Sequence, residues 1–450
     1  MRGLDKTEVK VAQLAGFVSD KAAYHHGEMS LTGAIIGMAQ DFVGSNNINI
    51  LVPAGQFGTR LKGGKDAASP RYIWTSLEKL TSIIYNSIDD PILNLQYEDN
   101  EPIEPEYYAP IIPMVLVNGA EGIGTGFSTK IPPYNPIEII KNIKNIMNNK
   151  PFELMDPWWQ GFEGMIYKID EFNYEIFGTW SVNDNKVTIT ELPVGEWTSN
   201  YKEFLEKMLE DTPVKTKSDD KKPKKQPKKD NNFIGYKDSN TESKVNFELT
   251  FEDGYLSTVK DIEKLLHLNK KYSITNMHLY GPEGHIKRYH TVEEIMNDYY
   301  SVRLKLYKAR KEYQLAILEY QLKIISFKVK FILMVVQKEI EINNKKKQEI
   351  EETLEKNKFP KFGKNKNDTK LTYDYLLTMP IYNLSYEKIE ELKKQQEDKN
   401  LEYKVLEILT PEDIWTKELD ILEEEYNKWY KVKSELANST GKKKVKKSKK

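Results

Sequence analysis

The last third of the sequence carries a long run of helical periodicity. From Thr291 onward neither glycine nor proline occurs until Pro360. This pattern predicts a helix of roughly 50 residues, extending on the order of 75 Å, with Thr291 and Glu294 as its N-terminal cap. The apolar positions with helical spacing are Ile295, Tyr299, Val302, Leu306, Tyr313, Ile317, Tyr320 and Ile324.

So long a helix needs a partner, because a helix with one apolar face is stable only when that face is packed. The stretch from Tyr386 to about Leu409 is predicted to fold back on it as the antiparallel partner in a coiled coil. Thr410 and Pro411 are typical of the start of a third helix, as cap and first-turn proline. The apolar piece from Leu371 to Leu384 lies at the far end of this hairpin and is a candidate contact surface.

The first 155 residues have a mixed pattern of short apolar runs and glycines, as expected for a globular α+β domain. Asn135, Pro136 and Glu138 predict a helix with an N-cap, a first-turn proline and a capping-box acid. The apolar run Ile111 to Val117 has the appearance of a strand. We therefore expect a first domain over residues 1–155.

The pattern changes to strand-like pieces after this domain. Polar and apolar residues alternate from Lys186 to Glu191 as in a strand, which ends at Leu192-Pro193. Residues 156–290 are therefore predicted to form a β-rich domain. Within it, residues 214–232 are rich in lysine and read as a disordered insertion, with nonspecific DNA contact as the functional alternative. Residues 291–437 form the helical region, and 438–450 a disordered basic tail.

Composition restricts the chemistry without identifying it. The 67 basic and 68 acidic residues nearly cancel, so contact with nucleic acid would have to come from local basic clusters. The chain has no cysteine, which excludes disulfides and thiol catalysis. No apolar run reaches the roughly 18 residues of a membrane span. The 6 histidines show no metal-ligand spacing, and no Asp-x-Asp pair occurs, so we expect no complete metal centre.

Two glycine-rich stretches resemble phosphate cradles but lack essential residues. In Gly58 to Asp66 the second glycine is out of register with the lysine, and Asp66 stands where a P-loop requires serine or threonine. Gly119 to Gly126 has Phe127 where a dinucleotide-binding fingerprint needs its third glycine. Nucleotide binding through either stretch is therefore rejected.

A basic segment, Arg60, Lys62 and Lys65, leads into Arg71 and Tyr72. An arginine beside a tyrosine offers a phosphate clamp next to a phenol. Because a phenol with a pKa of about 10 is a weak nucleophile at neutral pH, it needs a neighbouring cation or base to react with phosphate. Tyr72 is thus a candidate nucleophile among the 27 tyrosines.

Longer motifs, in the same order along the chain, resemble the breakage-reunion region of eukaryotic-type type II DNA topoisomerases. The resemblance extends to about position 430 through Met379-Pro380 and the long helices. The motifs are Gln13 to Gly16, Ala23 to Ser30, Gln40 to Asn47, Gly55 to Arg60, Gly64 to Tyr72, Ile112 to Val115, Asn118 to Gly126, and Glu191 to Val194 with Trp197.

The resemblance implies a winged-helix breakage domain, a β-rich tower and a coiled coil ending in a dimer gate. It implies that Tyr72 attacks DNA and stays on the 5′ end, that Arg71 stabilises the transition state, and that His26 assists by hydrogen bonding or proton transfer. Ile123 is expected to wedge into a base step and kink the duplex. The remaining DNA contacts it implies are Tyr24, Ser30, Arg60, Lys65 and Trp197.

The resemblance also implies a homodimer that acts on double-stranded DNA in the nucleus and requires Mg²⁺ and ATP. The family's metal-binding and ATPase domains do not appear in the sequence, so we expect a piece of a longer protein that binds DNA but cleaves it poorly by itself. Phe127 and Gly195 depart from the family pattern, which commonly has tryptophan and a basic residue there. Two rival interpretations are a non-catalytic coiled-coil DNA scaffold and a tyrosine recombinase, of which the second leaves the long helices unexplained.

Overall fold

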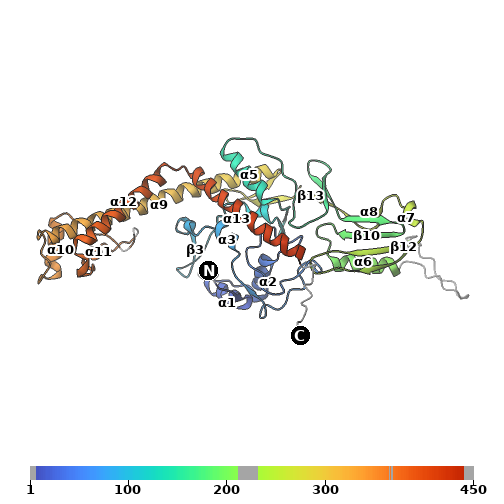
Figure 1. The fold of residues 1–450 in the computed structure, drawn as a ribbon, viewed down its shortest axis with the longest axis horizontal. Helices are drawn as coiled ribbons and strands as arrows, with labels where there is room; N and C mark the ends of the chain where they lie inside the picture. Colours follow the sequence, from blue (N-terminus) through green and yellow to red (C-terminus); the bar gives the residue numbers. More distant parts are fainter. Residues whose placement is uncertain (1–6, 211–231, 364, 366–367, 440–450) are drawn as a thin grey trace, which may run out of the picture. The chain divides into compact units, whose positions relative to one another are not determined.

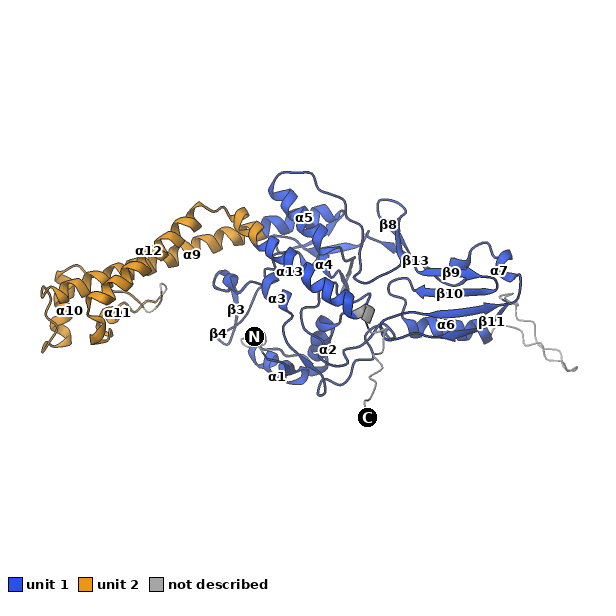
Figure 2. Ribbon diagram, in the orientation of Figure 1, with its two compact units in different colours: residues 1–302, 418–450 blue, residues 303–417 orange. Residues whose placement is uncertain are grey.

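The computed structural model describes residues 7–210, 232–363, 365 and 368–439, with the side chains of 437–439 excepted. It contains helices and strands in mixed order, as predicted (Figure 1). The chain divides into two compact units, the first made of residues 1–302 and 418–450 and the second of residues 303–417 (Figure 2). The predicted disorder of 214–232 and 438–450 falls outside the described residues, apart from position 232 and the last two residues of the final helix.

The first unit begins with two helices, α1 (Val11–Lys21) and α2 (Glu28–Ala39), that pack on each other. Val11, Leu14 and Ala15 are the buried residues of α1, at the i, i+3 and i+4 spacing of one helix face. Their core is completed by apolar residues of α2 and of the segment that follows it. Strand β1 (Val9–Lys10) pairs antiparallel with β2 (Trp74–Thr75), which fixes the segment before β2 against the start of α1.

The rest of the first 155 residues is made of short elements and two hairpins. The predicted strand at Ile111 to Val117 is wrong: Met114–Val117 is a one-turn helix, and the run is apolar because both its ends are buried. The predicted helix is confirmed as α5 (Pro136–Met147), capped by Asn135. The remaining elements are α3 (Lys79–Ile84), η1 (Ser87–Ile92), β3 (Leu95–Glu98), β4 (Glu101–Pro105), α4 (Met114–Val117), β5 (Ala120–Gly124) and β6 (Phe127–Ile131).

A four-stranded antiparallel sheet with the order β11-β12-β10-β9 forms the core of the β-rich region. Helix α6 (Thr198–Glu210) covers one face and buries Tyr201, Leu205 and Met208, at i, i+4 and i+7, against apolar residues of β10 and β12. The predicted strand is confirmed as β10 (Lys186–Glu191). Its partners are β9 (Thr179–Asn183), β11 (Phe233–Asp238) and β12 (Phe247–Phe251).

Two smaller sheets complete this region. One has the order β13-β8-β7, and the other is the hairpin of β14 and β15. The elements are β7 (Met165–Lys168), β8 (Asn173–Phe177), α7 (Tyr255–Thr258), α8 (Ile262–Leu265), β13 (Asn269–Ser273), β14 (Met277–Tyr280) and β15 (Ile286–Tyr289).

The long helix predicted from the periodicity is α9 (Val292–Val336), 45 residues in length. Its start is capped as expected, since the Glu294 N–H donates to the Thr291 hydroxyl and the Glu294 carboxylate accepts from the His290 N–H. The two other predicted helices are confirmed as α12 (Tyr386–Ile408) and α13 (Pro411–Ser439).

Within the second unit, α9 and α12 run antiparallel. The Lys311 ammonium donates to the Glu407 carbonyl at 2.9 Å near one end, and Val329 packs in one core cluster with Ile389 near the other. That cluster also includes residues of two short helices at the turn of the hairpin, α10 (Lys347–Lys356) and α11 (Asp374–Leu377). The 3-10 helix η2 (Ile381–Asn383) follows them and buries none of its residues.

The end of α13 belongs to the first unit and is held there by ion pairs. Lys144 of α5 donates to Asp420 at 2.8 Å and to Glu423 at 2.7 Å, and Lys433 pairs with Asp41 at 3.0 Å. Helix α13 therefore secures two segments from the first third of the chain.

Candidate active site and nucleic-acid interface

Tyr72 projects from a loop whose backbone is fixed on both sides. The first amides of α1 have no partner within the helix. Two of them are satisfied by this loop, since Val11 N–H donates to the Ile73 carbonyl and Ala12 N–H to the Pro70 carbonyl, both at 3.1 Å. Ile73 is buried, whereas the Tyr72 side chain is 77% exposed. The phenol is thus held out from a rigid base and is open to a large ligand.

Arg71 is exposed beside Tyr72. Within the described residues, the side chains of Arg71 and Tyr72 form no hydrogen bond or ion pair with any other residue. A guanidinium keeps its charge at any physiological pH and can donate two parallel hydrogen bonds to two oxygens of one phosphate. The two neighbours can therefore meet the same phosphate, one as a cation and the other as a phenol.

His26 lies in the loop that joins α1 to α2. Tyr24 in the same loop is held by its N–H to the Ser19 carbonyl at 3.1 Å, and its ring meets that of His26 edge to face at a centroid distance of 5.4 Å. Among the described residues no hydrogen bond or ring contact joins His26 to Tyr72. His26, Ser30 and Lys65 are all exposed, and Tyr24 is half-buried.

Arg60 differs from its predicted role as a DNA contact. The residue is only 4% exposed, and its side chain donates through two nitrogens to the carboxylate of Glu191, at 2.5 and 3.3 Å. That carboxylate also accepts the N–H groups of Glu163 and Leu192. The guanidinium is thus enclosed, and in this structure it joins the first 155 residues to strand β10.

The glycine-rich segment before Tyr72 is packed tightly against Trp197 and Gln40. A side chain at Gly63 would lie 2.3 Å from the Trp197 ring, and one at Gly64 would lie 2.3 Å from the Gln40 amide. That amide donates to the carbonyls of Phe57 and Gly64. These glycines of the segment are therefore packing positions, where a larger side chain would clash. Trp197, predicted to contact DNA, is half-buried against this segment.

Asp66 closes this segment into a loop. Its carboxylate accepts from the Thr59 N–H at 2.9 Å and from the Thr59 hydroxyl at 2.6 Å. Burial alone would raise the pKa of Asp66, but the two hydrogen bonds from Thr59, a hydrogen bond from its own backbone and the charge of Lys62 together hold this pKa below its ordinary value. Asp66, which departs from the P-loop pattern, thus holds the loop from Thr59 to Asp66 closed.

Ile123 stands near the tip of the hairpin formed by β5 and β6. It pairs across the hairpin with Ser128, and its side chain is 93% exposed. The residues from Glu121 to Ser128 are all exposed, and the hairpin is buried only at its base, where Ile131 lies. No core contact accounts for an isoleucine in such a position.

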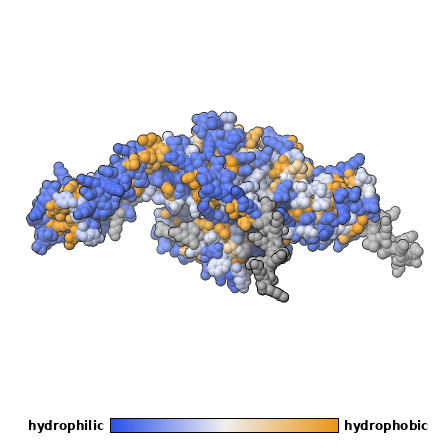
Figure 3. Space-filling view, in the orientation of Figure 1, coloured by the Kyte–Doolittle hydropathy of each residue, from blue (hydrophilic) through white to orange (hydrophobic). Residues whose placement is uncertain are grey.

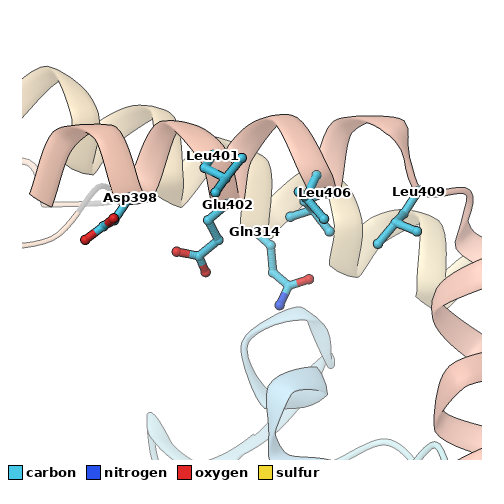
Figure 4. A pocket seen from close by; sticks show the side chains of 7 residues that line it. Gln314, Asp398, Leu401, Glu402, Leu406 and Leu409 are labelled. Atoms are coloured by element: carbon cyan, nitrogen blue, oxygen red, sulfur yellow. The ribbon is translucent and has the colours of Figure 1, made fainter. Parts of the chain in front are cut away.

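Other surface features of the described residues do not assemble a second candidate site. The described residues hold no cluster of three or more potential metal ligands, and no helix in the described ranges is long and apolar enough to cross a membrane. The visible face is largely hydrophilic with apolar residues interspersed (Figure 3). A shallow depression between α9 and α12, lined by Gln314, Leu401, Glu402 and Leu406 among others, brings no basic or nucleophilic side chain together (Figure 4).

Comparison with known proteins gives consistent matches over nearly the whole chain. The family model that describes the A subunit of DNA gyrase/topoisomerase IV matches residues 1–420. The protein named DNA topoisomerase 2 of Acanthamoeba polyphaga mimivirus is 41% identical over 95% of this chain and 38% of its own length. That of Saccharomyces cerevisiae is 39% identical over 94% of this chain and 32% of its own length. The chain therefore spans about a third of these relatives.

A solved structure has the same fold. The DNA-binding, cleavage and re-ligation domain of Plasmodium falciparum topoisomerase II superposes with a TM-score of 0.85 at 39% identity, over 96% of this chain and 60% of that one. The predicted fold class is confirmed by this match.

Proposed function

This chain belongs to the family of DNA gyrase/topoisomerase IV A subunits. On that premise we propose that it supplies the DNA-breaking and gate-forming part of a type II DNA topoisomerase. The observation that carries the proposal is the exposed Tyr72 phenol beside the exposed Arg71, on a loop pinned by the first amides of α1. The names of the relatives support the same activity.

The proposed reaction is a transfer of phosphate between two oxygens. The Tyr72 phenol oxygen bonds to a backbone phosphorus of DNA while the bond from that phosphorus to the 3′ oxygen breaks. The phenol gives up its proton, and the released 3′ oxygen gains one, with His26 proposed as a hydrogen-bond or proton-transfer partner. Arg71 stabilises the charge that develops on the phosphate oxygens. Because a phosphodiester replaces a phosphodiester, the strand can be resealed by the reverse step.

Two copies of the chain are proposed to act together, one on each strand of a duplex. Residues 1–155 would break DNA, 156–290 would form the tower, and 291–437 the coiled coil and gate. At the turn of the helical hairpin, Ile381 and Tyr382 are 84% and 80% exposed, as suits a surface that a second copy covers. Tyr24, Ser30, Lys65 and Trp197 are proposed as further DNA contacts, but Arg60 is not, because it is buried.

Mg²⁺ and ATP are proposed to act through parts of the longer protein. Among the described residues, no group of three or more carboxylates and histidines could hold a metal ion. A nuclear location is proposed from the eukaryotic relatives in yeast and Caenorhabditis elegans. Tagging the protein in cells and imaging it with a DNA stain tests this location.

The function is tested by following one purified DNA topoisomer through the reaction of the complete enzyme with Mg²⁺ and ATP. Passage of one duplex through a break in another changes the linking number in steps of two, which gel electrophoresis resolves. Steps of one, as single-strand breakage would give, contradict the proposal. DNA binding without any change of linking number would favour the non-catalytic scaffold instead.

Ile123→Ala should reduce DNA bending far more than DNA binding. Insertion of an apolar side chain into a base step offsets part of an unstacking cost of a few kcal/mol, so loss of the side chain should lower the bent population roughly tenfold. Bending is measured by energy transfer between dyes at the ends of a short duplex, and binding by fluorescence anisotropy.

The matched control for this variant is Ile234→Ala, which removes an isoleucine that is exposed on β11 instead. If both variants bend DNA as the unchanged protein does, Ile123 is not a wedge.

A further inference from the structure

The hairpin of β5 and β6, which carries Ile123, is poorly suited to keep a fixed orientation without outside contacts. It has two strands, its tip is exposed, and glycines stand at positions 122, 124 and 126. Two-stranded hairpins are marginal in water, and glycine within a strand weakens it further. A side chain that must enter a base step at a defined angle needs support from outside such a hairpin.

That support comes from the segment leading into β14. The Lys130 N–H of β6 donates to the Asn276 carbonyl at 2.7 Å, and the Asn276 side-chain amide donates to the Ser128 hydroxyl at 2.8 Å. The His278 N–H donates to the Thr129 hydroxyl at 3.1 Å. Three consecutive residues of β6 are thus held by two residues about 150 positions away in the sequence.

The contact to Ser128 bears directly on Ile123. These two residues are cross-strand partners, and partners in an antiparallel pair place their side chains on the same face of the sheet. The Asn276 amide therefore grips the hairpin on the face from which Ile123 projects. Asn276 is itself oriented by His278, whose Nδ1 lies 2.9 Å from the Asn276 amide oxygen. The His278 ring in turn contacts the Phe127 ring edge to face, at a centroid distance of 6.1 Å.

The supporting hairpin has a firm base of its own. Met277 of β14 and its partner Tyr289 of β15 are buried, and the Tyr289 hydroxyl donates to Asp298 in the first turns of α9 at 2.8 Å. The support for β6 is thus continuous with the start of the long helix, in the part of α9 that belongs to the first unit.

We propose that Asn276 and His278 are positioning residues that set the direction in which Ile123 enters DNA. This proposal rests on the proposed function, because it presumes that Ile123 is the wedge. Neither residue need touch the reacting phosphate. Their effect is on the fraction of bound DNA that is bent, and through it on the rate of cleavage.

Asn276→Ala, in the complete enzyme, is expected to lower the bent fraction of bound DNA about fivefold, as loss of roughly one hydrogen bond would do. DNA affinity should change less than twofold, since Ile123 and the basic surface are intact. Ser128→Ala should have a similar effect, and the double variant should be no worse than either single one, because both remove the same contact. Ser128→Thr, which keeps the hydroxyl, should retain bending.

The matched control is His285→Ala against His278→Ala. His285 is exposed on the same hairpin between β14 and β15, and its contact in that hairpin is made by its backbone carbonyl. His285→Ala should bend DNA normally and His278→Ala should not. Circular dichroism of each variant checks that the loss is not one of folding.

The proposal is overturned if Asn276→Ala bends DNA normally, or if affinity and bending fall in parallel. If Ile123→Ala abolishes bending while Asn276→Ala leaves it unchanged, the wedge stands and only the positioning role fails. If Ile123→Ala itself bends DNA normally, both fail together. A failure of the strand-passage function appears separately, as the absence of linking-number changes in the unchanged enzyme.

Discussion

Tyr72→Phe should abolish the covalent adduct between protein and DNA while leaving the fold intact. The substitution removes only the hydroxyl, and loss of an enzymatic nucleophile lowers the rate on the order of 10³-fold or more. The ring is 77% exposed, so the free energy of unfolding should stay within about 0.5 kcal/mol of its original value. Adducts are trapped by rapid denaturation on a nicked duplex, with the Mg²⁺-binding domain supplied.

Tyr97→Phe is the control for this result. Tyr97 is another well-exposed tyrosine of the first unit, on strand β3. Its variant should form adducts at the original rate. Adduct formation by Tyr72→Phe at that same rate would mean that another group attacks the phosphate.

Glu191→Ala should destabilise the first unit severely. It leaves the buried Arg60 guanidinium without its carboxylate, and breaking a buried pair in this way costs about 3–5 kcal/mol. The variant also strands the N–H groups of Glu163 and Leu192. Denaturant titration followed by tryptophan fluorescence measures the change, because Trp197 lies in the segment that this pair secures.

Glu248→Ala on the neighbouring strand β12 is the comparison. It breaks an ion pair with Lys186 in the same sheet, but that pair is exposed and contributes little to stability. The double variant Arg60→Met with Glu191→Leu should recover part of the loss, since it buries no unpaired charge. Equal effects of Glu191→Ala and Glu248→Ala would show that the buried pair has no special structural role.

The elements that sequence predicted well are those whose ends are marked by local chemistry. Helices α5, α9 and α13 begin at caps that can be identified within four residues, and α12 begins after Ser385, which accepts from the Lys388 N–H. The strand predicted at Ile111 to Val117 was wrong because an apolar run without polar residues shows neither the helical nor the strand periodicity. A short helix there cannot be told from a strand.

Motifs in the sequence indicate which residues to consider for the candidate site, but they do not indicate which of these residues distant contacts bury. Tyr72 and Arg71 stand in one motif, and the structure leaves both exposed. Arg60 stands in another, yet its partner Glu191 is 131 positions away, and nothing local to Arg60 indicates burial. The support of the Ile123 hairpin by Asn276 was missed for the same reason. In each case the deciding contact is between segments that only the fold brings together.

The central claim is that the Tyr72 oxygen forms the bond to DNA, and the most direct measurement is to locate that bond. The trapped adduct is digested with protease and nuclease, and the peptide that retains a nucleotide is sequenced by mass spectrometry. We predict that the nucleotide is attached through its 5′ phosphate to the peptide containing Tyr72. A nucleotide on any other residue, or one attached through a 3′ phosphate, would contradict the account.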